Sequence, residues 1–234
     1  MTLPAPFALS PQPRVRAERI GHQGTAVAVV DDCLAAPEAA AALAASLGYS
    51  PIGPYYPGVR ASLGPDVAAA FGAALGDIIA DALSLEAARW AGDCFFSIVT
   101  ARPESLAPIQ RLPHFDGLED ARIAAVLFLA SADFGGTSFY RHRTTGFETV
   151  NAARYPAYGA ALKADVARHG LPPAAYIGDG APLFDEIATF EPVFNRLLLY
   201  RGAALHCSRM RNAEALSADP RKGRLTLNLF LQPA

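Results

Sequence analysis

The run Gln110-Arg111-Leu112-Pro113-His114-Phe115-Asp116-Gly117 places an imidazole and a carboxylate two positions apart. We expect residues 111–116 to form a strand, in which both side chains leave the same face because successive Cβ atoms alternate. Their ligand atoms can then converge on one point. Two histidines and one carboxylate on one side of an ion form the facial triad that suits non-haem Fe(II) and leaves coordination positions open. The rest of the chain must therefore supply a second histidine.

The candidate for this second histidine is His206, which we expect to end a hairpin over residues 197–206. It lies 90 residues beyond Asp116, so only a folded sheet can bring the two together. The competing interpretation is a buried histidine whose ring bonds to the backbone. We predict that His114, Asp116 and His206 together form the metal site and the catalytic centre.

The expected last strand carries a candidate anchor for an anionic co-substrate. Arg224 stands near its start, and Thr226 shares its face by alternation. A dicarboxylate needs a fixed cation at its distal end, and the planar guanidinium meets a carboxylate through two hydrogen bonds. Gln110 would share the face of His114 on a regular strand and could also contact the co-substrate. The alternative role for Arg224 is a surface salt bridge.

Composition restricts the class of protein. The chain has 234 residues, of which 52% are hydrophobic and 18% charged, so one large domain with a sizeable core is expected. The formal net charge of −2 gives no support for a nucleic-acid partner, and we expect no membrane association. Three scattered cysteines, without a CxxC pair, indicate reduced thiols rather than a disulfide framework or a structural zinc site. We predict a cytoplasmic protein.

The order of the expected elements favours a mainly β (α+β) fold with a jelly-roll core and N-terminal helices packed on one side. Residues 1–25 are expected to be an extended lead-in with a short strand at most, and residues 26–234 a single domain with an insertion at 144–195. Hydrophobic periodicity predicts helices at 38–47, 65–85 and 156–169, with a further short helix at 183–190. Strands are expected at 25–30, 94–100, 111–116, 122–130, 137–141, 196–200, 202–206 and 224–231.

At this point the chain resembles a known superfamily, the Fe(II)/2-oxoglutarate-dependent oxygenases, whose fold is a double-stranded β-helix, or jelly roll. The resemblance covers roughly residues 26–232 and is strongest to prolyl-hydroxylase-like members and to a bacterial branch without a settled substrate. It rests on the order of His114-x-Asp116, His206 and Arg224. It also rests on the segments Val30-Asp31-Asp32-Cys33-Leu34, Tyr56-Pro57-Gly58-Val59-Arg60, Gln110 to Asp116 and Gly135-Gly136-Thr137-Ser138-Phe139.

The resemblance implies Fe(II), 2-oxoglutarate and O₂ as cofactor and co-substrates, with release of succinate and CO₂. It implies iron on His114, Asp116 and His206, and 2-oxoglutarate held by Arg224. Because position 116 is Asp rather than Gly or Ala, it implies hydroxylation, or a desaturation, rather than halogenation. Arg224 follows His206 by 18 residues, further than in many members, so Arg209 or Arg211 is an alternative anchor.

We also assign expected roles to five other residues. Tyr55, Tyr56 and Arg60 lie in a loop, residues 50–64, that together with the insertion is expected to select the substrate; the alternative is a packed turn. His142 is expected to line the mouth of the site or to be solvated. Cys207 should face away from His206 as a buried thiol.

Two other functions stay open. One is a jelly-roll binding module without turnover, which would not need three convergent ligands. The other is a cupin-like metal enzyme of another reaction type, such as an isomerase, although cupins usually use more histidines. The substrate is expected to be an amino acid, a peptide residue or a small metabolite, and the oligomeric state is open, a homodimer included.

Overall fold

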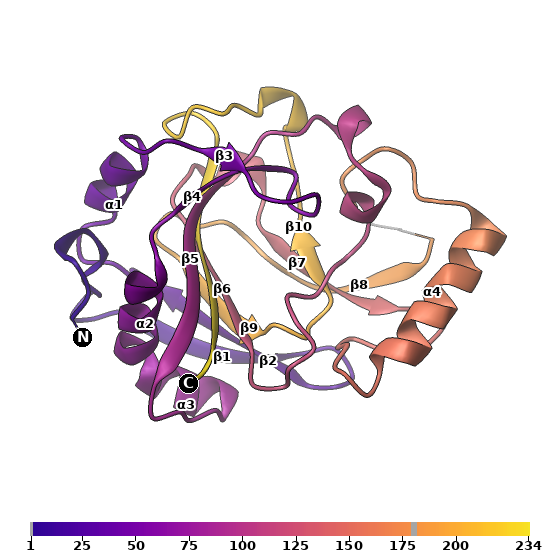
Figure 1. Cartoon of the computed structure of the whole chain (residues 1–234), viewed down its shortest axis with the longest axis horizontal. Helices are drawn as coiled ribbons and strands as arrows, with labels where there is room; N and C mark the ends of the chain where they lie inside the picture. Colours follow the sequence, from indigo (N-terminus) through magenta and orange to yellow (C-terminus); the bar gives the residue numbers. More distant parts are fainter. Residues whose placement is uncertain (1, 179–181) are drawn as a thin grey trace.

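The computed structural model describes residues 2–178 and 182–234 and is shown in Figure 1. Over these residues the chain is mainly β, with four α-helices and several short 3-10 helices. The helices are α1 (Pro37–Ala44), α2 (Pro65–Ala74), α3 (Gly76–Leu83) and α4 (Tyr155–His169). The strands are β1 (Arg14–Ile20), β2 (Thr25–Asp31), β3 (Ser50–Pro51), β4 (Gly58–Ser62), β5 (Trp90–Val99), β6 (Ile123–Phe128), β7 (Thr137–His142), β8 (Phe184–Phe190), β9 (Leu197–Arg201), β10 (His206–Ser208) and β11 (Arg224–Pro233).

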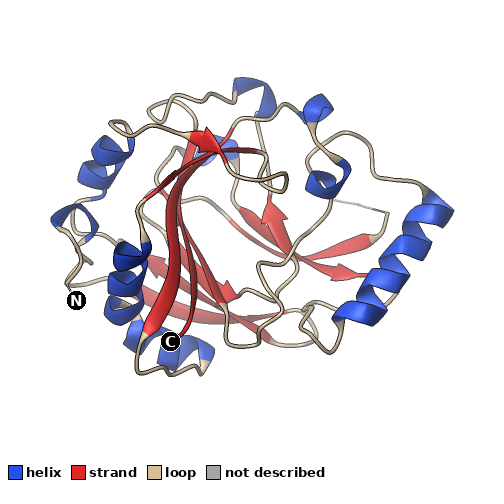
Figure 2. Cartoon of the chain, viewed as in Figure 1, coloured by secondary structure: helices blue, strands red, loops and turns tan. Residues whose placement is uncertain are grey.

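The strands form two antiparallel sheets. The larger has the order β1-β2-β9-β6-β11-β5-β4-β3, and the smaller has the order β10-β7-β8. The last strand therefore lies inside the larger sheet, between two strands from the middle of the chain, since β11 pairs with both β5 and β6. Figure 2 shows helices α1, α2 and α3 on one side of the larger sheet, and α4 beside the smaller one. The expected placement of the N-terminal helices on one side is thus observed.

Strand β11 shows why the larger sheet has two different faces. Leu225, Leu227, Leu229 and Leu231 are fully buried and pack against the helices α1–α3. The alternate residues, from Arg224 to Phe230, point to the opposite face, because side chains alternate along a strand. This opposite face turns toward the smaller sheet, and we call it the inner face.

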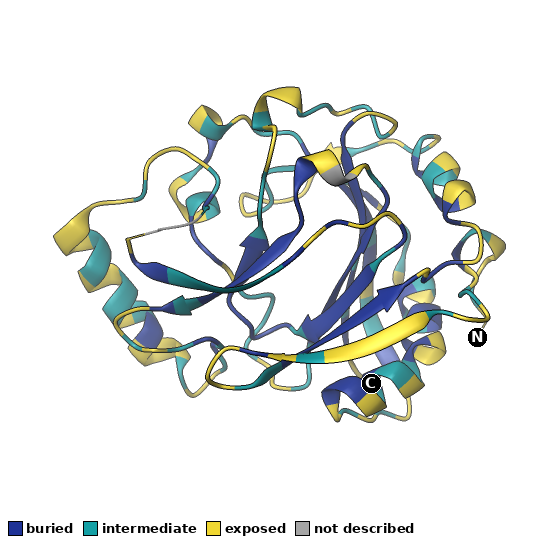
Figure 3. Ribbon diagram, turned by 180° about the vertical axis from the view of Figure 1, so that it is seen from behind, coloured by how far each residue is buried: buried dark blue, intermediate teal, exposed yellow. Residues whose placement is uncertain are grey.

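Between the two sheets lies an apolar layer. It is formed by residues of both sheets, including Phe128 and Tyr200 of the larger and Phe139 and Phe190 of the smaller. The ring of Phe139 stands edge-on to that of Tyr200, with centroids 4.9 Å apart. Figure 3 shows the buried strands at the centre, whereas the edge strand β1 is largely exposed. The polar residues of the inner face must therefore be satisfied by one another or by a ligand.

A separate cluster joins α4 to the other side of the smaller sheet. Tyr158 of α4 packs there with Tyr140, Phe184 and Val150. The predicted helix at 183–190 is wrong, because these residues form β8, which pairs with β7. The tertiary pairing decides the conformation of this short apolar run. The part of the predicted insertion that falls on 179–181 lies outside the described residues.

The other differences from the expected elements have local causes. Residues 111–116 do not form a regular strand: a 3-10 helix, Pro108–Arg111, precedes an extended segment in which Pro113 lacks the N–H that a ladder needs. The helix expected at 65–85 divides between α2 and α3 at Leu75, beside Gly76. Residues 202 and 203 form a turn and Ala204 only an isolated bridge, so His206 begins a strand instead of ending one.

The segment expected to be an extended lead-in also contributes more than predicted. Strand β1, seven residues long, pairs along its whole length with β2. Arg16 of β1 donates a hydrogen bond to Asp31 of β2, at 3.0 Å. The first 25 residues thus supply one edge strand of the larger sheet.

Asp31→Asn is expected to lower the free energy of unfolding by about 2 kcal/mol at pH 7, because it leaves Arg196 without its carboxylate in a mostly buried pair. The hydrogen bonds from Arg196 hold the pKa of Asp31 below its ordinary value of 3.8. Its contribution is therefore complete above that value and is lost as the pH falls through the lowered pKa. Urea unfolding of both proteins from pH 7 to pH 2.5 would measure this.

The adjacent Asp32 supplies a matched control. Its side chain is 59% exposed and pairs with the exposed Arg14, so Asp32→Asn should change the stability by less than about 0.5 kcal/mol. Asp32 has a φ of 55°, a conformation that Asn tolerates well. Equal effects of the two substitutions would contradict the assignment of stability to the Asp31–Arg196 pair.

Candidate metal centre

Three side chains from distant parts of the chain converge between the two sheets. His114, Asp116 and His206 each present a ligand atom, and these atoms lie within 4.8 Å of one another. The Nε2 atom of His206 is 3.3 Å from Oδ2 of Asp116, and Nε2 of His114 is 3.7 Å from Oδ1 of Asp116. The structure thus brings together the three predicted ligands, at distances that one metal ion could span.

Main-chain hydrogen bonds hold the two ligand segments side by side. His114 and His206 form an isolated antiparallel bridge, in which each N–H donates to the other residue's carbonyl at 2.9 Å. The N–H of Asp116 donates to the carbonyl of Gly202 at 2.7 Å. His114 and Asp116 therefore converge without the regular strand that we expected for them.

The ring of His206 is fixed by its surroundings. Its Nδ1 atom lies 2.9 Å from the carbonyl of Ala204, which favours the tautomer with the proton on Nδ1. The free Nε2 then faces Asp116. Tyr200 and Phe139 pack against the ring, with centroids 4.8 and 6.1 Å away. This arrangement, with one ring nitrogen bonded to a carbonyl and the other free, is the usual one for a metal-binding histidine.

Local electrostatics favour the metal-binding forms of two of the three groups. Withdrawal from bulk water and the neighbouring His206 lower the pKa of His114 to about 4, so its imidazole is neutral at neutral pH. Burial acts to raise the pKa of Asp116, but His206, His114 and Arg60 outweigh it, so the pKa is lowered. A neutral imidazole and an ionised carboxylate are the forms that bind metals.

The three candidate ligands differ in their access to solvent. The His114 side chain is 51% exposed, whereas those of Asp116 and His206 are 13% and 6% exposed. His114 is nevertheless surrounded densely enough for desolvation to dominate its pKa. One side of the His114 imidazole therefore faces solvent, while the other faces Asp116 and His206. The solvent-facing side is where further ligands of a metal would enter.

Arg224 lies buried on the inner face, only 4% exposed. Its Nε and Nη2 donate to the carbonyls of Gly135 and Gly136, at 3.2 and 3.0 Å. Both glycines are required, because a Cβ atom would collide with the carbonyl of Arg209 at the first and of Phe190 at the second. Within the described parts of the chain, no carboxylate lies within 4 Å of the Arg224 guanidinium. The two carbonyls do not neutralise the charge, and a buried cation is stabilised by a nearby anion.

The other two predicted co-substrate residues differ in placement. Thr226 is buried on the inner face, and its hydroxyl lies 2.8 Å from Oδ1 of Asn228. Gln110 lies in the 3-10 helix, where its side chain accepts a hydrogen bond from the N–H of Ala107 and donates one to the carbonyl of Pro54. The shared strand face on which the prediction for Gln110 depended is therefore absent.

The alternative anchors have carboxylate partners of their own. Arg209 forms an ion pair with Glu186 at 2.7 Å, and Arg211 one with Glu191 at the same distance. Both partners lie on or just beyond β8. Arg224 is thus the one of the three whose charge is not neutralised by a described carboxylate.

The inner face also carries polar residues that the sequence interpretation missed. Ser97 pairs with Thr226 in the β5–β11 ladder, and its hydroxyl is buried without a hydrogen-bond partner. Asn228 extends the series Arg224, Thr226 along the same face. Alternation along β11 could have identified Asn228, but Ser97 required knowledge of the strand register.

Two expectations outside the cluster had different outcomes. Cys207 is a buried free thiol on the opposite side of the smaller sheet, as predicted, and burial raises its pKa to about 12. The expectation for His142 is wrong. It is fully buried under α4, with Nε2 3.1 Å from Asp165 and Nδ1 3.0 Å from the Thr145 hydroxyl. Helix α4, whose position in the chain was predicted but whose packing was not, covers this face.

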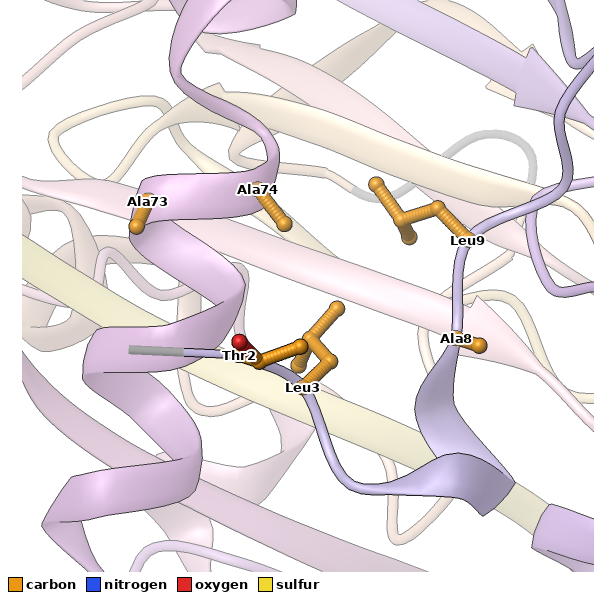
Figure 4. A pocket seen from close by; sticks show the side chains of 6 residues that line it. All are labelled: Thr2, Leu3, Ala8, Leu9, Ala73 and Ala74. Carbon is orange, nitrogen blue, oxygen red and sulfur yellow. The ribbon is translucent and has the colours of Figure 1, made fainter.

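A surface pocket of about 390 Å³ lies elsewhere, between the N-terminal segment and α2 (Figure 4). It shares no residue with the three-ligand cluster. Its lining offers one hydroxyl and no ionisable side chain, so it has no means of activating a substrate. The lining residues are Thr2, Leu3, Ala8, Leu9, Ala73 and Ala74.

The fold and the site define a mainly β protein with a cluster of two histidines and one carboxylate between its sheets. The chain belongs to a family of unknown function, DUF6445, whose model matches residues 11–231. A search of curated proteins gave no match. Among the described residues, no helix is both long and apolar enough to cross a membrane.

Three solved structures illustrate what the chain is similar to. A Pseudomonas putida prolyl-4-hydroxylase is 15% identical, with 85% of this chain and 88% of that one covered and a TM-score of 0.43. HygX from Streptomyces hygroscopicus with nickel, 2-oxoglutarate and hygromycin B bound is 12% identical, with 90% and 83% covered and a TM-score of 0.48. HygX with nickel and 2-oxoglutarate is 12% identical, with 85% and 78% covered and a TM-score of 0.43.

Proposed function

We propose that this chain is an Fe(II)/2-oxoglutarate-dependent oxygenase with a jelly-roll core, which hydroxylates a C–H bond of an amino acid, a peptide residue or a small metabolite. The observation that carries the proposal is the convergence of His114, Asp116 and His206 within 4.8 Å. A buried guanidinium without a described carboxylate partner, that of Arg224, lies on the inner face of the same sheet system.

The residues fit the proposed metal in number and in type. Two imidazole nitrogens and one carboxylate oxygen make the facial set typical of non-haem Fe(II). A structural zinc site would instead be closed by four ligands, usually including thiolates. All three cysteines are free, and Cys207 faces the opposite side of the smaller sheet. The exposed side of His114 is where co-substrate and O₂ would approach.

The residues of the site have distinct parts in the proposed reaction. Iron, when bound, supplies the oxidative chemistry that couples decarboxylation of 2-oxoglutarate to oxidation of the substrate. The carbonyl of Ala204 keeps His206 in the ligating orientation. Arg224 would hold the distal carboxylate of 2-oxoglutarate, with its guanidinium already fixed by the carbonyls of Gly135 and Gly136. Such prior positioning reduces the entropy lost on binding.

The proposal is tested by anaerobic titration of the protein with Fe(II) and 2-oxoglutarate, followed by admission of O₂. We expect a visible metal-to-ligand charge-transfer absorption and then formation of succinate. His114→Ala should show neither, because one of three ligands is missing. His169→Ala, at the end of α4 and outside the cluster, should behave like the wild type.

The two other functions predict different results in the same experiment. A binding module would give no succinate under any condition, whether or not iron binds. A cupin-like enzyme of another reaction type would bind iron and have no measurable affinity for 2-oxoglutarate. Either result would end the oxygenase proposal.

A further inference from the structure

A second guanidinium, that of Arg60, shares the inner face with Arg224. Arg60 of β4 pairs with Ser97 of β5, which in turn pairs with Thr226 of β11. Residues that pair directly across neighbouring strands point to the same side of a sheet. Arg60 and Arg224 are therefore two cations on one surface. The proposed co-substrate has a single distal carboxylate, so one of the two cations is left for another anion.

Aromatic rings surround the Arg60 guanidinium. Its central carbon lies 4.1 Å from the ring centroid of Tyr56, and 5.4 Å from those of Phe95 and Phe230. Cation–π contacts of this kind fix the plane of the guanidinium and leave its edge to form hydrogen bonds. The rings thus orient the fork without neutralising it.

The hydrogen-bonding groups of Arg60 are not satisfied within the part of the chain that the structure describes. Its Nε atom is buried without a hydrogen-bond partner, and no described carboxylate lies within 4 Å of the guanidinium. Burial lowers the pKa of Arg60 from its ordinary value. Arginine remains charged in proteins despite such shifts. An oriented cation with free donors is suited to bind an anion.

The charge of Arg60 contributes to the electrostatics of two candidate metal ligands. Burial and His206 dominate the pKa of both His114 and Asp116, and the charge of Arg60 adds a smaller lowering contribution to each. Asp116 is the one carboxylate whose charge contributes to the pKa of Arg60. The ionisable groups that contribute to the pKa of Arg224 are Tyr56, Tyr176, Cys207 and Tyr200. An anion held by Arg60 would therefore lie on the inner face, where the charge of Arg60 acts on the candidate ligands.

The charges of the site favour the same conclusion. Arg60, Arg224 and Asp116 together carry one net positive charge. A divalent metal ion and a 2-oxoglutarate dianion cancel each other and leave that charge in place. In a low-dielectric site such an excess attracts one further anionic group.

We propose that the substrate carries a carboxylate, and that Arg60 binds this carboxylate beside His114 and Asp116. The inference rests on the proposed function, whose substrate class it narrows to organic acids. The planar edge of the guanidinium matches a carboxylate through two parallel hydrogen bonds. Arg60 is thus a specificity-determining residue for the site, and Tyr56 positions it.

Fluorine NMR with fluoroacetate and its neutral analogue fluoroacetamide tests this proposal. The protein is loaded with Fe(II) and saturating 2-oxoglutarate under argon, and the Zn(II)-loaded protein serves as the diamagnetic reference. We expect the paramagnetic iron to broaden fluoroacetate at least about threefold more than fluoroacetamide, since only the anion pairs with Arg60. Arg60→Gln should abolish that difference, and Arg60→Lys should retain part of it.

Arg14→Gln, on the exposed edge strand β1, is the matched control and should preserve the full difference. Thermal unfolding shows whether each variant is folded. If Arg60→Gln is unfolded, the comparison of the two probes is made with Arg60→Lys, in which the difference should be reduced. Equal broadening of both probes by the wild type, or an undiminished difference in Arg60→Gln, would overturn the proposal. So would a difference that 2-oxoglutarate removes, because fluoroacetate would then occupy the co-substrate site.

Failure of the oxygenase proposal can be recognised separately. A wild-type protein without the charge-transfer absorption would refute the proposed co-substrate, and the same comparison of probes with iron alone would still decide whether Arg60 binds a carboxylate.

Discussion

His206→Ala is expected to weaken Fe(II) binding by more than about 100-fold, because losing a ligand costs more than losing one of its supporting hydrogen bonds. The remaining two ligands would hold the ion from one segment alone. Calorimetric titration with Fe(II) under argon, or with Mn(II) as an air-stable substitute, measures the change. The charge-transfer absorption with 2-oxoglutarate should disappear with it.

The matched control is His142→Ala, since His142 is also a buried histidine near a carboxylate but lies on the opposite side of the smaller sheet. We expect it to reduce stability while the folded protein keeps its affinity for iron. A His206→Ala protein that binds Fe(II) as tightly as the wild type would show that the three residues do not form the metal site.

Arg224→Met is expected to leave iron bound and to weaken 2-oxoglutarate binding by at least about 30-fold, equivalent to about 2 kcal/mol, the lower end of the cost of truncating a buried charge pair. Arg224→Lys should fall between the wild type and Arg224→Met, because lysine keeps the charge and loses the two-bond geometry. Both affinities follow from the charge-transfer absorption in anaerobic titrations.

Arg211→Met is the control for this prediction, since Arg211 is the alternative anchor whose guanidinium pairs with Glu191 at the surface. We expect its co-substrate affinity to stay within about twofold of the wild type, as for the loss of a surface ion pair. The reverse result, with Arg211→Met weakened and Arg224→Met unchanged, would transfer the anchor role to Arg211.

The convergence of His114, Asp116 and His206 could be predicted from the sequence, because few residue types suit a metal site. A histidine and an aspartate two apart, a later histidine and an arginine on an alternating last strand are visible without coordinates. The reason given for their convergence was partly wrong. His114 and Asp116 are placed by the bridge to His206 and by the bond from Asp116 to Gly202, and sequence alone does not show such pairings.

The fold was predictable where the sequence pattern was strong, as in the alternation of β11 and the continuous apolar run of β6, a central strand buried on both faces. It was not predictable where tertiary pairing decided the outcome. Phe184–Phe190 forms a strand because β7 is available to pair with it, and Arg14–Ile20 because β2 is. The importance of Arg60 likewise depends on register, since only its pairing with Ser97 places it on the inner face.

The bridge between His114 and His206 has a consequence for how the protein would exchange its metal. Two main-chain hydrogen bonds already close the long loop between these residues, so the loop-closure entropy is lost during folding and not when an ion arrives. A chelator should then strip the ion from an intact protein, in contrast to a zinc finger, which unfolds without its metal. Any rise in melting temperature on adding Fe(II) would reflect simple mass action on a ready-made site.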